Sequence, residues 1–272
     1  MRKRTGWARY VRAFLCAVLL LAAPAVARAQ AAGEPQPDAR AILLRMAEFV
    51  GKAQRLSVTV RGGYDAVQAS GQKIEWNEVR RVTISRPDRL RMEAERDDGA
   101  RTLVLFDGKE VTTFDEAGRV YAQAPQPGNV DDTLVYFVRD LGLRLPLAVL
   151  FVSRAPAMME RRVRSVAYVQ KTGIFGAPAH HIAGRTDTVD FQVWIADGDQ
   201  PLPLRAVMVY KTAPGQPQFR AQLSDWNLAA EPPDSLFMFT PPAEATKIPF
   251  ATAIASVAPG SKRASVKKGA RQ

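Results

Sequence analysis

Residues 86–123 have the clearest pattern of hydrophobic and polar positions in the chain, and it is the pattern of short β-strands. Between residues 89 and 95 apolar side chains alternate with charged ones, as in a strand with one buried face. Turn signals with Gly beside acidic residues follow at residues 97–99, 107–108 and 115–118, where Gly tolerates a positive φ. The stretch therefore predicts four strands in an antiparallel meander, with one apolar face and one wet face.

A helix and two longer strands are predicted ahead of this meander. Asp38 is a candidate N-cap, and apolar residues then recur at helical spacing as far as Gly51. Residues 56–61 alternate as a first strand, and residues 73–84 form a second. The parity of the apolar positions changes between Trp76 and Val79, which predicts a β-bulge there.

A helical insertion is predicted after the meander. Residues 130–143 have an acidic start and one apolar helical stripe, and residues 145–152 are almost wholly apolar. The stripe consists of Leu134, Phe137, Val138 and Leu141. A segment as apolar as residues 145–152 needs a cover, so we expect the insertion to lie on the sheet as a lid.

The second half of the chain returns to strands. Alternating segments separated by Gly, Pro and Asp turns occur at residues 163–169, 180–184, 189–195, 202–211 and 219–228. Residues 235–240 fit either a short helix or a last edge strand. The whole pattern predicts a mainly β (α+β) protein with about 11 strands.

The start of the chain has the features of a secretory signal peptide. A basic segment precedes a short apolar run, and Ala27-Arg28-Ala29 fits a cleavage site. The alternative interpretation is a single membrane anchor, but the apolar run is too short to span a bilayer comfortably. We expect a signal peptide over residues 1–29, a linker over residues 30–37, one domain over residues 38–250, a disordered basic tail over residues 251–272, and a periplasmic location.

Charge and cysteine content narrow the function further. The net charge of +11 comes entirely from basic residues before residue 30 and after residue 250, so residues 30–250 are neutral and nucleic-acid binding is not expected. The tail could contact anionic membranes weakly. Cys16 is the only cysteine and lies in the expected signal peptide, which excludes disulfides and cysteine-based catalysis from the mature chain.

Catalytic and metal-binding patterns are weak. His180 and His181 are adjacent on a strand and point to opposite faces, so we expect one packed and one solvated side chain and no metal site. Asp197-Gly198-Asp199 is interpreted as a hairpin turn rather than a calcium loop. The common hydrolase and phosphate-binding motifs are absent from the sequence. We therefore expect a protein that is not an enzyme and needs no cofactor.

Four motifs in order resemble a known superfamily. They are R-P-D-R-L-R-M from Arg86, L-V-L-F-D-G-K-E-V-T-T-F-D from Leu103, W-I-A-D-G-D-Q-P-L-P-L-R-A-V from Trp194 and F-M-F-T-P-P from Phe237. The chain resembles the LolA/LolB-like lipoprotein carriers and, more closely, a family of predicted periplasmic proteins of unknown function in that superfamily. The resemblance implies a strongly curved antiparallel sheet that forms an incomplete barrel, with helices that plug its open side and an apolar cavity between them.

Two functions remain open. The first is a periplasmic carrier, expected to be monomeric, for an apolar, acylated lipid or lipoprotein ligand; the second is an envelope interaction or sensor module with a packed core and a protein-binding rim. A cavity of several hundred Å³ favours the carrier, and a filled core favours the module. The candidate cavity and lid residues are Trp76, Leu90, Met92, Leu103, Leu105, Tyr121, Leu134, Phe137, Leu141, Leu150, Phe151, Trp194, Met208 and Tyr210.

Overall fold

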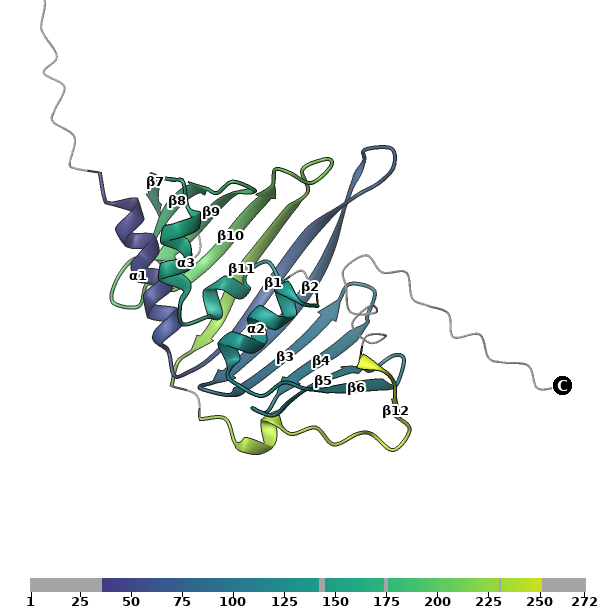
Figure 1. Ribbon diagram of the computed structural model, residues 1–272. Helices are drawn as coiled ribbons and strands as arrows, with labels where there is room; N and C mark the ends of the chain where they lie inside the picture. The colour runs from purple at the N-terminus through teal and green to yellow at the C-terminus, as the bar shows by residue number, and fades with distance from the viewer. Residues whose placement is uncertain (1–35, 142–144, 174–175, 230, 251–272) are drawn as a thin grey trace, which may run out of the picture. The chain divides into compact units, whose positions relative to one another are not determined.

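A single twelve-stranded sheet runs through the computed structural model, which describes residues 36–141, 145–173, 176–229 and 231–250. The strand order is β12-β6-β5-β4-β3-β2-β1-β11-β10-β9-β8-β7. Because β12 and β7 end the sheet without pairing with each other, the sheet stays open (Figure 1). The predicted mainly β fold, with a curved and incompletely closed antiparallel sheet, is confirmed; only β12 pairs in parallel, with β6.

The strands follow the predicted segments closely. Their bounds are β1 Arg55–Val67, β2 Lys73–Ser85, β3 Arg89–Arg96, β4 Arg101–Phe106, β5 Glu110–Asp115, β6 Val120–Pro125, β7 Ser165–Thr172, β8 Ala179–Arg185, β9 Val189–Ala196, β10 Pro203–Tyr210, β11 Gln218–Asn227 and β12 Thr246–Lys247. From β1 to β6 and from β7 to β11, strands that are neighbours in sequence pair antiparallel, and β1 joins the two halves by pairing with both β2 and β11.

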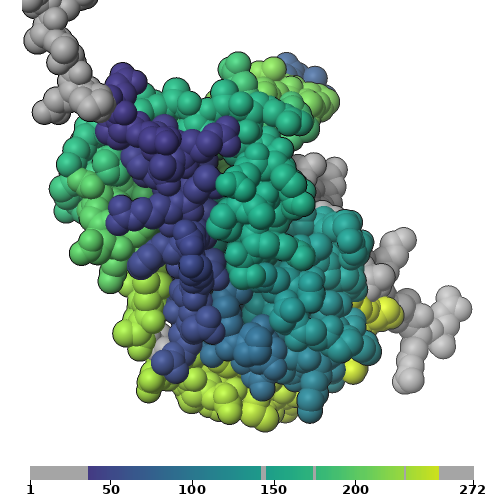
Figure 2. Space-filling view, turned by 60° about the vertical axis from the view of Figure 1, so that its left-hand side comes forward, coloured from purple at the N-terminus to yellow at the C-terminus, as the bar shows by residue number. Residues whose placement is uncertain are grey.

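Three α-helices lie on one face of the sheet (Figure 1). They are α1 Ala39–Lys52, α2 Val130–Arg139 and α3 Ala155–Arg162, and a 3₁₀ helix, η1 Ala148–Phe151, joins α2 to α3. Asp38 caps α1 by accepting from the amides of Arg40 and Ala41, and Asn129 caps α2. In Figure 2, α1 and the insertion lie side by side as one layer, and α1 packs against α3 and η1.

The main hydrophobic core lies between this helical layer and the sheet. The face that the helices cover, called here the inner face, carries buried residues of β1, β2, β3 and β11 in register, among them Val60, Val82, Leu90 and Leu223. The opposite face is called the outer face. The helices contribute Met46, Leu134 and other buried side chains to the same core.

The C-terminal segment covers part of the outer face. It contains the 3₁₀ helix η2 Asp234–Phe237, and the ring of Phe239 packs on Phe114 and Tyr121 with centroid distances of 5.7 and 5.3 Å. Leu105 on the same face is buried. The outer face of β4, β5 and β6 is therefore apolar and partly covered, and the prediction of one apolar and one wet face is wrong for these three strands, whereas β3 keeps the charged Arg91 and Glu93 on its outer face.

Several local predictions also need correction. The bulge between Trp76 and Val79 is absent, because β2 pairs with β1 in unbroken register from Lys73 to Ser85. In the third meander turn Arg119, and not Gly118, takes the positive φ. Val138 is 45% exposed and does not belong to the buried stripe of α2.

Other elements were assigned differently or missed. Of the two alternatives for residues 235–240, the short helix is confirmed in part: the 3₁₀ helix η2 covers their first half, and residues 238–240 lie in neither a helix nor a strand. Helix α3 and strand β12 were not predicted, since α3 is only eight residues long and buries only Ala155, and β12 is two residues long. The expected signal peptide and tail lie outside the described residues.

Candidate functional site

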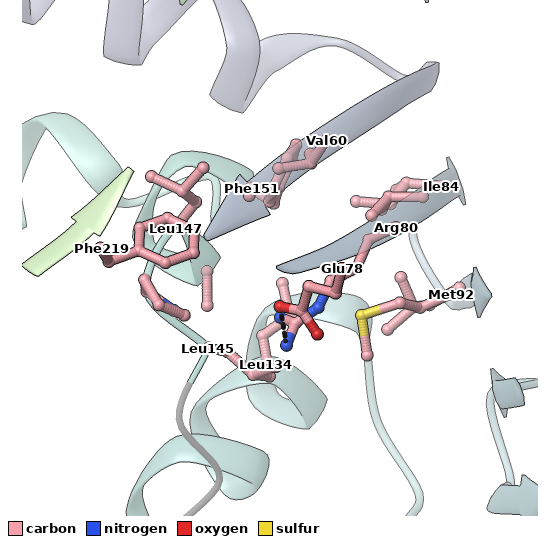
Figure 3. A pocket seen from close by; sticks show the side chains of 15 residues that line it. Val60, Glu78, Arg80, Ile84, Met92, Leu134, Leu145, Leu147, Phe151 and Phe219 are labelled. Carbon is pink, nitrogen blue, oxygen red and sulfur yellow. Dashed lines mark ion pairs between the residues drawn. The ribbon is translucent and has the colours of Figure 1, made fainter. Parts of the chain in front are cut away.

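A small cavity lies between the inner face of the sheet and the insertion (Figure 3). Its volume is about 50 Å³. The lining residues are Val60, Gly62, Glu78, Arg80, Val82, Ile84, Leu90, Met92, Leu134, Leu145, Pro146, Leu147, Ala148, Phe151 and Phe219. All of them except Glu78 and Arg80 are apolar.

Strand alternation brings these residues together. Residues opposite each other in paired strands share a face, and Val60 of β1 lies between Arg80 of β2 and Leu223 of β11. Even-numbered positions of β2 therefore point to the inner face, and those from 78 to 84 line the cavity. The glycine at position 62 leaves room for the ring of Phe219, since a Cβ there would lie only 3.0 Å from that ring.

Leu145 to Phe151 close the cavity from the helix side and are called here the plug. The plug contributes a third of the lining residues, through Leu145, Pro146, Leu147, Ala148 and Phe151. Its backbone makes single-turn hydrogen bonds, from the amide of Ala148 to the carbonyl of Leu145 and from Leu150 to Leu147. The plug is thus held mainly by apolar packing.

The C-terminal end of the plug is fixed by Arg86. The guanidinium of Arg86 donates to the carbonyls of Phe151 (2.6 Å) and Ala53 (3.0 Å) and forms a 2.9 Å ion pair with Asp131. Asp131 in turn accepts from the amide and hydroxyl of Ser153. The Arg86 clamp therefore joins the ends of α1 and the plug to the start of α2.

Glu78 and Arg80 form a buried ion pair in this apolar lining. Arg80 Nη2 lies 2.6 Å from Glu78 Oε1, and the side chains are 16% and 9% exposed. Arg80 Nε is buried and has no hydrogen-bond partner in the described structure. Nearby, burial and then the charge of Glu78 raise the pKa of Tyr64.

The predicted site residues fall into four groups. Leu90, Met92, Leu134 and Phe151 line the cavity. Phe137, Leu141 and Leu150 pack in the insertion around it, and Met208 and Tyr210 pack on the inner face beside it. Trp76 is 42% exposed on the part of β2 that extends beyond β3. Their role in ligand binding stays a prediction.

Four candidates lie away from the cavity, on the outer face. Leu103 and Leu105 are opposite Glu93 and Arg91, and Leu103 is also opposite Phe114, whose neighbour is Tyr121. The ring of Trp194 stacks on His181 at 4.1 Å. Their hydrophobicity misled the sequence prediction because both faces of this sheet are covered in places.

Sequence reasoning missed the Glu78–Arg80 pair. The sequence did contain a signal for this pair, namely the change in parity of the apolar positions between Trp76 and Val79, which was interpreted as a β-bulge. Val79, which caused it, is an apolar residue on the outer side of β2, while charged residues take the inner positions 78 and 80.

The two histidines lie in different environments, and neither is solvated as predicted. His180 Nδ1 is 3.2 Å from the hydroxyl of Tyr168, and its Nε2 is 3.0 Å from Asp197. Lys171 forms a 2.5 Å ion pair with Asp197, and this hydrogen bond lowers the pKa of Asp197. These residues do not line the cavity.

Other sites were sought in the described ranges. A polar groove of about 300 Å³ lies on the outer face, between β1, β2, β3 and η2, and includes Arg81 and Arg91. Within the ranges the structure describes, His, Cys, Asp and Glu side chains form no cluster of three suited to a metal ion. None of the helices described is long and apolar enough to cross a bilayer.

The comparison with protein families is decisive for family membership. The model of a family described as "Predicted periplasmic protein (DUF2092)" matches residues 39–251. The chain belongs to this family. The DUF2092 match spans α1 and all twelve strands, and it confirms the predicted resemblance to a family of predicted periplasmic proteins. Its description also agrees with the expected location.

Solved structures resemble this DUF2092 chain at low identity. LppX from Mycobacterium tuberculosis is 15% identical, with a TM-score of 0.44 and coverage of 72% of this chain and 98% of its own. LprF from Mycobacterium bovis is 14% identical, with a TM-score of 0.44 and coverage of 79% and 100%. A LolA superfamily protein from Nitrosomonas europaea is 13% identical, with a TM-score of 0.36 and coverage of 74% and 97%. No curated protein matches the chain, and likenesses this distant do not assign a ligand.

Proposed function

We propose that this protein is a periplasmic binding or carrier protein, not an enzyme, whose ligand is an apolar acyl chain. The observation that supports this most is the composition of the cavity, whose lining is apolar apart from one ion pair. A second support is the plug, because five of its residues line the cavity and their apolar side chains could be replaced there by an acyl chain.

The cavity as it stands is too small for such a ligand. Its volume is about 50 Å³, whereas ligand sites usually measure roughly 300–1,000 Å³. Under this proposal the small cavity corresponds to a closed state. Uptake requires the plug to move outward and lie over the bound chain as a lid.

The free energies of burial allow an acyl chain to replace the plug in the cavity. Exposing Leu145 and Leu147 completely would cost about 3–6 kcal/mol, at roughly 1.5–3 kcal/mol for each side chain. An acyl chain gains about 0.8 kcal/mol for each buried methylene. Chains longer than about eight carbons therefore outweigh the loss of the plug's own contacts.

The contacts of the plug indicate which of its two ends moves. Its C-terminal end is fixed by the Arg86 clamp through Phe151, while residues 145–148 depend on apolar contacts and one short turn. The clamp is thus the hinge, and Leu145 to Ala148 swing away from the sheet.

Calorimetric titration with monoacylglycerols of increasing chain length tests the proposal. We expect no binding for chains of about six carbons and clear binding from about ten carbons upward. Native mass spectrometry of protein purified from the periplasm should show a co-purified acyl compound. Folded protein that binds no chain of any length overturns the proposal.

The small cavity also favours the second candidate, an envelope interaction module with a packed core. In that case the plug is a permanent part of the core. The same titration separates the two functions, because a packed core binds no acylglycerol while the protein keeps its stability.

A further inference from the structure

The Glu78–Arg80 pair occupies a place where apolar residues would serve stability better. Positions 78 and 80 continue the inner row of β2 that includes Val82 and Ile84, and all four line the cavity. Both charges lose their hydration when they are buried. A buried ion pair therefore stabilises a protein no more than apolar residues of similar volume, and often less. The packing of the fold therefore does not explain the pair.

The pair also has spare hydrogen-bonding capacity. One contact, Arg80 Nη2 to Glu78 Oε1, joins the two groups, and Arg80 Nε remains buried without a partner. A buried N–H without an acceptor has lost its hydration without replacement, so it is destabilising. Figure 3 shows both side chains pointing towards Leu134 of α2, next to Met92. An acceptor on a ligand in this space would satisfy the donor.

The net charge of the pair selects the kind of acceptor. Glu78 and Arg80 together are neutral, so a charged ligand head beside them would be buried without its own counter-ion. A carboxylate would also be repelled by Glu78, and an ammonium by Arg80. An uncharged ester or amide carbonyl avoids both penalties and accepts the free N–H.

We propose that Glu78 and Arg80 form a head-group site that selects acyl chains ending in an uncharged ester or amide over free fatty acids. This inference rests on the proposed function, because it assumes that an acyl chain enters the cavity. An ester implies a lipid as the source, and an amide implies an acylated protein or peptide. Both present the same carbonyl to Arg80.

Selectivity in calorimetric titration at pH 8 tests the inference. The ligands are palmitate, monopalmitoylglycerol and an uncharged N-palmitoyl dipeptide amide. For the natural chain we expect at least tenfold tighter binding of the two uncharged ligands than of palmitate. Comparing those two ligands then identifies the source of the acyl chain.

Glu78→Gln is the decisive variant. It leaves the charge of Arg80 uncompensated, so palmitate should bind at least tenfold more tightly than to the natural chain. Glu93→Gln is the matched control, because Glu93 pairs with Arg91 at the same two-residue spacing on the outer face. We expect the control to keep the natural selectivity.

A second variant covers the case in which Glu78→Gln does not fold. The double variant Glu78→Gln/Arg80→Met buries no charge, and we expect it to bind monopalmitoylglycerol about tenfold more weakly, since the donor to the carbonyl is lost. Equal binding of palmitate and monopalmitoylglycerol by the natural chain, or unchanged behaviour of the variants, overturns the inference and leaves the proposed function standing. Absence of binding to all three ligands overturns both.

Discussion

A single guanidinium, that of Arg86, connects three elements that are far apart in the sequence. Its side chain is 9% exposed, and it contacts Ala53, Asp131 and Phe151. Replacing it by methionine leaves Asp131 without its cation, and breaking a buried pair in this way costs about 3–5 kcal/mol. Urea unfolding of Arg86→Met should show this loss.

The control for this prediction is Arg164→Met. Arg164 pairs with Asp187 at 2.7 Å, but both side chains are exposed, so the unfolding midpoint should hardly change. Equal losses in the two variants would mean that the clamp stabilises no more than a surface pair.

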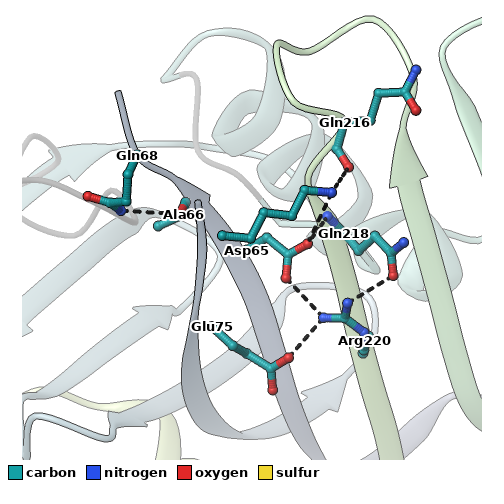
Figure 4. A network of polar contacts seen from close by, with 8 residues as sticks. Asp65, Ala66, Gln68, Glu75, Gln216, Gln218 and Arg220 are labelled. Atoms are coloured by element: carbon teal, nitrogen blue, oxygen red, sulfur yellow. Dashed lines mark hydrogen bonds and ion pairs between the residues drawn. The ribbon is translucent and has the colours of Figure 1, made fainter. Parts of the chain in front are cut away.

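Asp65 makes the stability depend on pH. It is almost buried and accepts from the amide of Gln218 and from Arg220, both at 3.0 Å (Figure 4). Burial by itself raises the pKa of this carboxyl, but the two hydrogen bonds outweigh it and hold the pKa below the ordinary 3.8. A lowered pKa in the folded state stabilises the protein above the unfolded-state value, and this stabilisation is lost as the pH falls through the folded-state value.

The corresponding variant is Asp65→Asn. We expect it to be less stable than the natural chain by roughly 1–3 kcal/mol at neutral pH. This difference should stay constant from about pH 7 to about pH 5 and shrink below about pH 4. Urea unfolding at several pH values measures it, and a difference that grows on acidification contradicts the assignment.

Gly184 allows close packing of an aromatic ring. A Cβ at this position would lie 2.1 Å from Cζ of Phe191, so Gly184→Ala forces the ring to move. We expect a loss of about 1–3 kcal/mol in the free energy of unfolding, as for other overpacked sites. Gly173→Ala is the control, because a Cβ there meets no atom within 4 Å; similar losses for both would show that the ring contact is unimportant.

At the scale of elements, the plug has to be the most easily opened part of the inner core. Within it, η1 is a four-residue 3₁₀ helix without a side-chain cap, and short segments of this kind open locally at a low free energy. Without ligand, the amides of residues 147–150 should exchange hydrogen faster than those of β1 and β2. Adding monopalmitoylglycerol should slow this exchange, because the plug then lies over the bound chain.

Leu147→Asp separates a movable plug from a fixed core element. If the plug moves, the charged side chain turns to solvent and circular dichroism should show an intact fold with a lower unfolding midpoint. If the plug is fixed, the buried charge has no partner and the domain unfolds. Global unfolding would contradict both the movable plug and the carrier function.

At the scale of the whole molecule, the chain combines a neutral domain with basic ends. The five basic residues after residue 250 are accompanied by no acidic residue and little apolar surface. Deleting residues 261–272 should therefore leave the thermal midpoint nearly unchanged. Calorimetry measures the effect, and a clear drop would show that this segment contributes to the stability of the domain.

The sequence by itself determined the strands of the sheet and the helices at its start and in the insertion. Alternation at residues 89–95 and the turns near Gly99 and Gly108 are local signals, and local backbone preferences act in the same way in any fold. The cap at Asp38 belongs to this class, since its hydrogen bonds join it to residues two and three positions away. These elements could be predicted without knowledge of the rest of the chain.

The tertiary structure alone decided which face each residue occupies and what covers it. Phe114 and Tyr121 are covered by Phe239, more than a hundred residues later in the chain, and Arg86 meets Phe151 only because the insertion folds back. The charges at positions 78 and 80 look like an irregular strand in the sequence, but unbroken pairing with β1 places them inside the cavity. Burial depends on contacts between distant segments, and alternation within one strand shows which residues share a face but not which face is covered.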